Sequence, residues 1–77
     1  MDELKLKQVI GSVLGVPAES IDENTSTDTV EAWSSLEHLN LILALEEEFG
    51  VTIPDEEAAD LTSYPLIRLV VAEQVAA

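Results

Sequence analysis

The side chains that could do chemistry in this chain are few. His38 is the only histidine and cysteine is absent, so no nucleophile and general base can be paired as a catalytic site requires. We therefore expect that the chain is not an enzyme. Ser35 lies at the start of a predicted helix, where free backbone amides and the helix dipole favour an anion such as a phosphodiester. An ordinary first-turn serine would occupy the same position, so position alone leaves both interpretations open.

The polar segment before that helix begins like a calcium-binding loop. Asp22, Asn24 and Ser26 follow the alternate spacing of oxygen ligands in an EF-hand. The pattern then fails, because the sixth position is Thr27 where glycine is needed and the twelfth is Trp33 where glutamate is needed. We therefore expect no specific metal site.

The elements that position these residues are predicted from apolar periodicity. Residues 4–14 repeat apolar side chains at spacings of three and four, which predicts an amphipathic helix ending before Gly15. The same spacing predicts a helix over residues 35–49, closed by Gly50 in the left-handed conformation. Two further helices are predicted, a short one of one or two turns within residues 55–61, with acids in its first turn, and a last one over residues 63–74.

The start of the second helix has a capping sequence. Ser34 and Glu37 form a Ser-x-x-Glu pattern, in which each side chain bonds the free backbone amide of the other residue. This pattern places Ser35 at the first helical position. Residues 16–33 are mostly polar, and since loops of this length are uncommon in small domains, we expect a short helical turn near residues 17–21.

The composition predicts an acidic protein with protein partners. The 77 residues are 47% apolar and have a formal net charge of -13, and residues 9–67 contain no Lys or Arg. This one-sign field argues against nucleic acid and favours basic protein surfaces. The length suits one core, so we expect a single domain over residues 1–77 that is monomeric. No signal segment and no apolar stretch near the roughly 18 residues of a membrane span are visible, so we expect a cytoplasmic protein without a membrane span.

The second helix has more apolar surface than one face requires. Its core-facing side is expected to consist of Leu41, Ile42, Leu45 and Phe49. Nearly opposite lies a second apolar stripe, here called the leucine stripe, made of Leu36, Leu39 and Leu43, with Asn40, Glu46 and Glu47 beside it. An exposed apolar stripe rimmed by acids is typical of a docking surface for a groove rimmed by Lys and Arg. The alternative is a central helix that buries both stripes.

Three segments together resemble the acyl carrier protein family. They are Ser34-Ser35-Leu36-Glu37, the Leu-Ala-Leu-Glu-Glu-Glu-Phe-Gly run at residues 43–50, and Ile-Pro-Asp-Glu-Glu-Ala at residues 53–58. The resemblance covers nearly the whole chain. It implies an all-α four-helix bundle with a long first loop and a short third helix, and a 4'-phosphopantetheine arm transferred from coenzyme A to Ser35. The arm would hold acyl groups as thioesters for fatty acid, polyketide or related biosynthesis, with an aminoacyl or peptidyl carrier as the nearest alternative.

The resemblance also implies partners. They are a phosphopantetheinyl transferase and acyl-loading and acyl-processing enzymes with basic docking surfaces. The residues expected to contact these enzymes are Ser34, Leu36, Leu39, Asn40, Leu43, Glu46, Glu47 and Glu56. An acidic adaptor related to the carriers, with Ser35 unmodified, would use the same surface.

The chain departs from the family pattern just before the modified serine. The family usually has aspartate there, often as Trp-Asp-Ser-Leu, whereas here Ser34 follows Trp33. Serine keeps a capping oxygen but lacks the charge. With His38 and Asn40 the first half of the helix is also less negative than is usual, which indicates a specialised carrier from a dedicated pathway. Trp33 could equally be a packing residue at the end of the loop.

Overall fold

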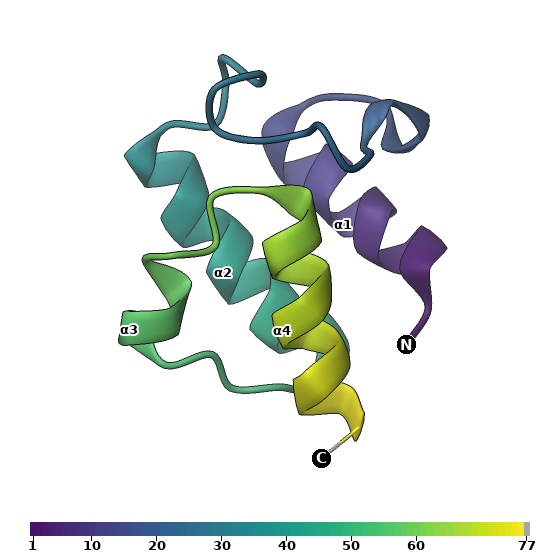
Figure 1. Cartoon of the computed structure of the whole chain (residues 1–77), viewed down its shortest axis with the longest axis vertical. Helices are drawn as coiled ribbons and strands as arrows, with labels where there is room; N and C mark the ends of the chain where they lie inside the picture. Colours follow the sequence, from purple (N-terminus) through teal and green to yellow (C-terminus); the bar gives the residue numbers. More distant parts are fainter. Residues whose placement is uncertain (77) are drawn as a thin grey trace.

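The computed structural model describes residues 1–76, which form four α-helices and a short 3₁₀ helix (Figure 1). They are α1 (Glu3–Leu14), η1 (Ala18–Ser20), α2 (Ser35–Phe49), α3 (Asp55–Ala58) and α4 (Tyr64–Ala76). Figure 1 shows α4 between α1 on one side and α3 on the other, with α2 behind it. The predicted all-α fold with a long first loop and a short third helix is confirmed.

Local chemistry places the first helix and the turn after it. The Asp2 carboxylate caps α1, accepting a hydrogen bond of 3.1 Å from the Lys5 amide. The helix ends at Gly15, whose φ of 73° is the left-handed conformation open to glycine. The turn expected near residues 17–21 is the 3₁₀ helix η1.

The third helix is a single turn. The prediction of a helix of one or two turns within residues 55–61 is confirmed; the helix ends at Ala58, and the amides of Asp60 and Leu61 bond the carbonyls three residues before them. This tighter turn brings Leu61 into the core, where its side chain is buried.

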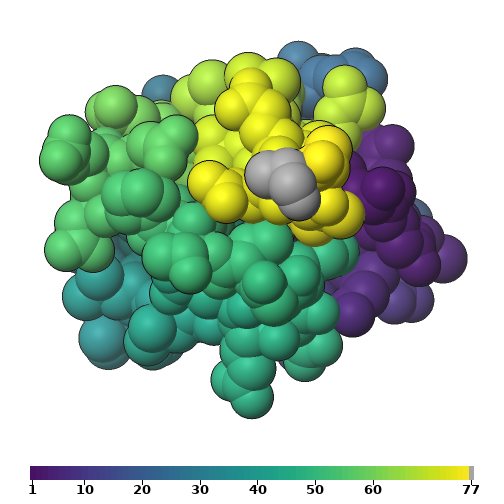
Figure 2. Space-filling view, turned by 90° about the horizontal axis from the view of Figure 1, so that it is seen from below, coloured from purple at the N-terminus to yellow at the C-terminus, as the bar shows by residue number. Residues whose placement is uncertain are grey.

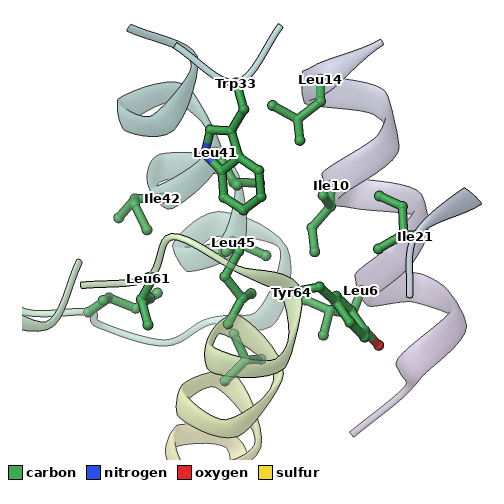
Figure 3. Close-up of a cluster of buried hydrophobic side chains, with 13 residues drawn as sticks. Leu6, Ile10, Leu14, Ile21, Trp33, Leu41, Ile42, Leu45, Leu61 and Tyr64 are labelled. Atoms are coloured by element: carbon green, nitrogen blue, oxygen red, sulfur yellow. The ribbon is translucent and has the colours of Figure 1, made fainter. Parts of the chain in front are cut away.

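The core contains side chains from every segment except η1 and α3 (Figure 3). Its buried members are Leu6, Ile10, Leu14, Ile21, Trp33, Leu41, Ile42, Leu45, Ile53, Leu61, Tyr64, Ile67 and Val71. In a chain of 77 residues without cysteine this packing must supply most of the stability.

The first loop is fastened to the segment between α3 and α4. The Tyr64 amide donates to the Thr25 carbonyl at 2.8 Å, and the Thr27 amide donates to the Thr62 carbonyl at 3.0 Å. The residues that resembled a calcium loop are used locally instead, since the Asp22 carboxylate accepts from the Asn24 amide at 2.8 Å. Within residues 1–76 no group of three or more His, Cys, Asp or Glu side chains is placed to hold a metal ion.

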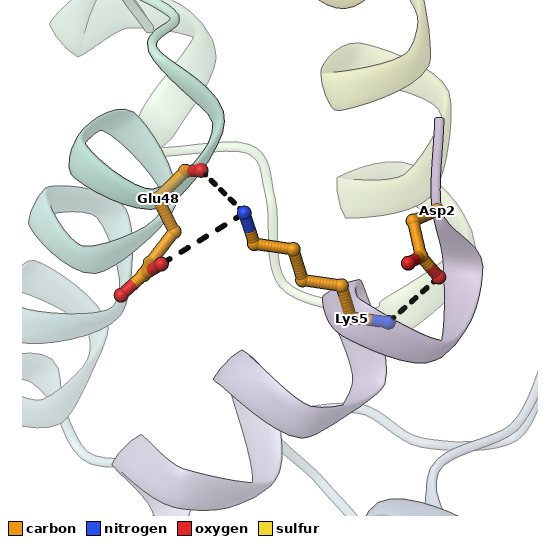
Figure 4. A network of polar contacts seen from close by, with 3 residues as sticks. All are labelled: Asp2, Lys5 and Glu48. Atoms are coloured by element: carbon orange, nitrogen blue, oxygen red, sulfur yellow. Dashed lines mark hydrogen bonds and ion pairs between the residues drawn. The ribbon is translucent and has the colours of Figure 1, made fainter.

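The cations of the chain make contacts between helices. Lys5 joins α1 to the end of α2, donating to the Glu48 carbonyl at 2.9 Å and lying 3.9 Å from the Glu48 carboxylate (Figure 4). Its ammonium also lies 5.1 Å from the centroid of the Phe49 ring. Phe49 was expected in the core and is only half-buried, at the edge of the core. Across the residues described, no helix is long and apolar enough to cross a bilayer.

A buried tyrosine joins α1 to α4. The Tyr64 hydroxyl donates to the Glu3 carboxylate at 2.7 Å, and Arg68 lies 3.4 Å from the same oxygen. The Tyr64 bond, with the charges of Arg68 and Lys7, holds the pKa of Glu3 below its ordinary value. Burial, and then the same bond, raises the pKa of Tyr64 far above its ordinary value. The tyrosine therefore stays neutral and donates a hydrogen bond to a charged glutamate.

Candidate functional site

The N-terminus of α2 begins as the capping sequence predicts, but only half of the expected exchange is made. The Ser34 hydroxyl accepts a hydrogen bond of 3.3 Å from the Glu37 amide. The prediction that the Glu37 side chain accepts a hydrogen bond from the Ser34 amide is wrong. That amide bonds the Ala32 carbonyl at 2.9 Å, and the Glu37 carboxylate accepts from Asn40 at 3.0 Å. A tight turn before the helix thus takes the donor that Glu37 was expected to satisfy.

Ser35 lies at the first position of α2 and is exposed. Among the hydrogen bonds of residues 1–76, none involves its hydroxyl or the backbone amides of Ser35 and Leu36. These donors lie at the positive end of a 15-residue helix. A phosphodiester on the Ser35 oxygen therefore fits the site, because the negative charge would lie against free amides and the hydroxyl is open to a modifying enzyme.

The two stripes of α2 differ in burial as expected. Leu36, Leu39 and Leu43 are 67%, 62% and 63% exposed, whereas Leu41 and Leu45 are fully buried. The prediction of an exposed leucine stripe is confirmed, and the alternative in which α2 buries both faces is wrong. Figure 2 shows α3 on the opposite side of the molecule from α1, with α2 between them.

The acids expected beside the leucine stripe differ in their surroundings. Glu47 and Glu56 are exposed, as is Asn40. Glu46 is half-buried, and its carboxylate accepts a hydrogen bond of 2.9 Å from the Ile53 amide. It therefore has a structural role in holding the chain that leads into α3, a role that its place on the helix did not indicate.

A cavity of about 850 Å³, open to solvent beside the exposed Leu39 and Leu43, lies between α2 and α3. Its lining residues come from the first loop, α2, α3 and the segments on either side of α3. They are Thr27, Trp33, Ser34, Ser35, His38, Leu39, Ile42, Leu43, Glu46, Ile53, Asp55, Ala58, Ala59 and Thr62. Ser35 is among them, so a group attached to its hydroxyl would start at the edge of this cavity. None of the three Lys and Arg residues lines it.

His38, considered above as a general base and as a less negative helix position, is a structural element of the site. The Trp33 indole N–H donates to His38 Nδ1 at 3.0 Å, and His38 Nε2 lies 2.7 Å from the Ala58 carbonyl. The two rings are nearly parallel, at 23° to each other, with centroids 6.1 Å apart. The interpretation of Trp33 as a packing residue is confirmed, since its side chain is buried.

The sequence contained a signal for this pair. With Ser34 as the cap, Trp33 and His38 occupy the two positions that pack together in a hydrophobic staple, one before the cap and one on the fourth helical residue. The staple spacing predicts contact between the two rings. It does not predict the bond to Ala58, which is 20 residues further along the chain.

Comparison with known proteins agrees with this geometry. A family model described as "Phosphopantetheine attachment site" matches residues 4–67. The solution NMR structure of the holo acyl carrier protein from Geobacter metallireducens superposes with a TM-score of 0.85 at 26% sequence identity, covering 99% of this chain and 88% of that chain.

Proposed function

The chain belongs to the phosphopantetheine attachment family of acyl carrier proteins, and on that premise we propose that Ser35 carries the arm and that the protein presents acyl thioesters to the enzymes of fatty acid, polyketide or related biosynthesis. The family is one of carriers and not of catalysts. Its prosthetic group is 4'-phosphopantetheine, whose thiol supplies the thioester chemistry.

The observation that carries the attachment site is the surroundings of Ser35. Its hydroxyl is exposed and unbonded within the described residues, at the first position of α2, next to two free backbone amides. Attack by this oxygen on the pyrophosphate of coenzyme A forms the Ser35 Oγ–P bond. Adenosine 3',5'-bisphosphate leaves as the P–O bond breaks, and the hydroxyl proton passes to a base of the transferase. The product is an anion at a helix N-terminus, where amides and dipole stabilise it.

Partner enzymes are proposed to dock on the leucine stripe. Its three leucines are more than 60% exposed on the helix that begins with Ser35. Glu47 and Glu56 are exposed nearby on α2 and α3. A transferase or acyl-processing enzyme with an apolar groove rimmed by Lys and Arg would bury the leucines and pair with the acids.

Intact-mass analysis tests the proposal. The chain is incubated with coenzyme A and a promiscuous phosphopantetheinyl transferase, and the expected product carries one phosphopantetheine. Ser35→Ala should abolish the addition, whereas the neighbouring Ser34→Ala should retain it. Addition to Ser35→Ala would refute the assignment of Ser35, and no addition to the parent chain would favour an acidic adaptor that has no arm.

A further inference from the structure

The third helix has little of its own to hold it in place. It is a single turn, Asp55–Ala58, with no buried residue. Pro54 at its N-terminus offers no side-chain capping bond. A helix of this length is unstable in isolation. Its position must therefore be set by contacts at its two ends.

The buried side chains of Ile53 and Leu61 anchor the chain on either side of α3, and two hydrogen bonds with side chains of α2 add polar contacts there. His38 meets the Ala58 carbonyl at the end of α3 at 2.7 Å. Glu46 accepts from the Ile53 amide, just before α3, at 2.9 Å. Both side chains line the cavity between the two helices. The cavity is thus spanned by one polar contact toward each end of α3.

The direction of the His38 bond follows from its other partner. An indole nitrogen can only donate, so Nδ1 of His38 must accept from Trp33. In a neutral imidazole the proton then lies on Nε2, which donates to the Ala58 carbonyl. The buried Trp33 ring orients the imidazole, because its indole N–H bonds Nδ1. His38 therefore has both ring nitrogens bonded, with its donor aimed at the end of α3.

We propose that His38 is a positioning residue that fixes α3 across the cavity beside Ser35, and thereby limits the size of the acyl group that the cavity accepts. This inference rests on the proposed attachment of the arm to Ser35. Outward movement of α3 would break the His38–Ala58 bond and leave the half-buried imidazole donor and the carbonyl without their partners. An acyl group that needs a wider cavity must therefore overcome the free energy of the lost hydrogen bond.

Hydrogen exchange on the unmodified chain tests the first half of the proposal. The amides of Ala58, Ala59 and Leu61 are bonded within the α3 turn, and in His38→Ala their exchange should accelerate about 2- to 10-fold, the factor that corresponds to one net hydrogen bond. His38→Gln, which keeps a donor and an acceptor, should recover part of the protection. Asn40→Ala is the matched control, because Asn40 lies on α2 and bonds only Glu37. Unchanged exchange in His38→Ala would overturn the proposal.

Loading of the arm tests the second half. Parent and His38→Ala are loaded from butanoyl-, octanoyl- and dodecanoyl-coenzyme A, and amide shifts of residues 53–61 are recorded. In the parent the shift changes should level off as the acyl chain lengthens, whereas in His38→Ala they should continue to grow. Levelling at the same length in both proteins would overturn the size limit. Failure of Ser35 to accept the arm is seen by mass alone and refutes the proposed function, while the exchange comparison still decides the role of His38.

Discussion

Truncation of one leucine on each face of α2 separates folding from recognition. Leu45 is fully buried and Leu39 is 62% exposed, although they lie on the same helix six residues apart. Leu45→Ala removes buried methyl groups and leaves a cavity, which should lower the free energy of unfolding by about 2 to 5 kcal/mol. For Leu39 about a third of a full leucine burial is lost, and alanine is the better helix former, so the cost should stay below about 1 kcal/mol.

These losses are measurable against the total stability of a small domain. At about 0.05 to 0.15 kcal/mol per residue, a chain of this length is stable by roughly 4 to 12 kcal/mol. Leu45→Ala therefore removes a large share of the stability, and each lost kcal/mol should lower the Tm by about 4 to 8 °C. Urea unfolding followed by fluorescence suits the protein, because Trp33 is its only tryptophan and is buried.

The binding measurement completes the test. Leu39→Ala should fold nearly as well as the parent yet raise the KM of the transferase for the protein, because the leucine stripe is the surface proposed to dock. Equal losses of stability at both positions would refute the reasoning, since that result requires both faces of α2 to be buried. An unchanged KM for Leu39→Ala would remove Leu39 from the docking surface.

Three further predictions concern the cap, the α1–α4 contact and the acidic field. Ser34→Ala should lower the free energy of unfolding by about 0.5 to 2 kcal/mol because the bond to the Glu37 amide is lost. Ser34→Asp should keep the stability and be modified faster than the parent by a transferase adapted to Trp-Asp-Ser-Leu. Equal modification rates for Ser34→Asp and the parent would show that position 34 serves only as a cap. Because the pKa of Glu3 is lowered in the folded state, the stability that its charged form contributes is fully present above pH 4.5 and is lost as pH falls through the lowered pKa. Tyr64→Phe should therefore weaken the pH dependence of Tm in this acid range. An unaltered dependence would contradict the conclusion that the Tyr64 hydrogen bond lowers the pKa of Glu3. Binding of the transferase should weaken as salt rises, mainly through the association rate, because exposed charges are screened over about 8 Å at physiological ionic strength; an affinity indifferent to salt would assign binding to the leucine stripe.

Much of the fold follows from local sequence. The bounds of α1 and α2 were predicted to within one residue, because apolar spacing, capping side chains and the glycines after each helix act over a few neighbouring residues. The exposed leucine stripe was predicted for the same reason, since side chains on one helix keep fixed angular relations wherever the helix packs.

The candidate site was predicted only in part. Ser35 was placed at the first residue of α2 by sequence alone, and the structure adds that its hydroxyl is exposed. The predicted bond between the Glu37 side chain and the Ser34 amide was wrong, because the Ser34 amide bonds the Ala32 carbonyl in a backbone turn instead. The sequence left open whether α3 has one turn or two, and the structure ends it after one turn, before the buried Leu61.

The sequence by itself thus determined the helices, the exposed leucine stripe and the position of the serine, since each depends on chemistry within a turn or two of helix. Tertiary structure decided the cavity and the residues that span it. His38 bonds a carbonyl 20 residues away, and the Glu46 carboxylate bonds an amide in the segment before α3. Such contacts exist only after α2, α3 and the first loop pack together, because the relative placement of separate elements depends on the whole core and on no local pattern.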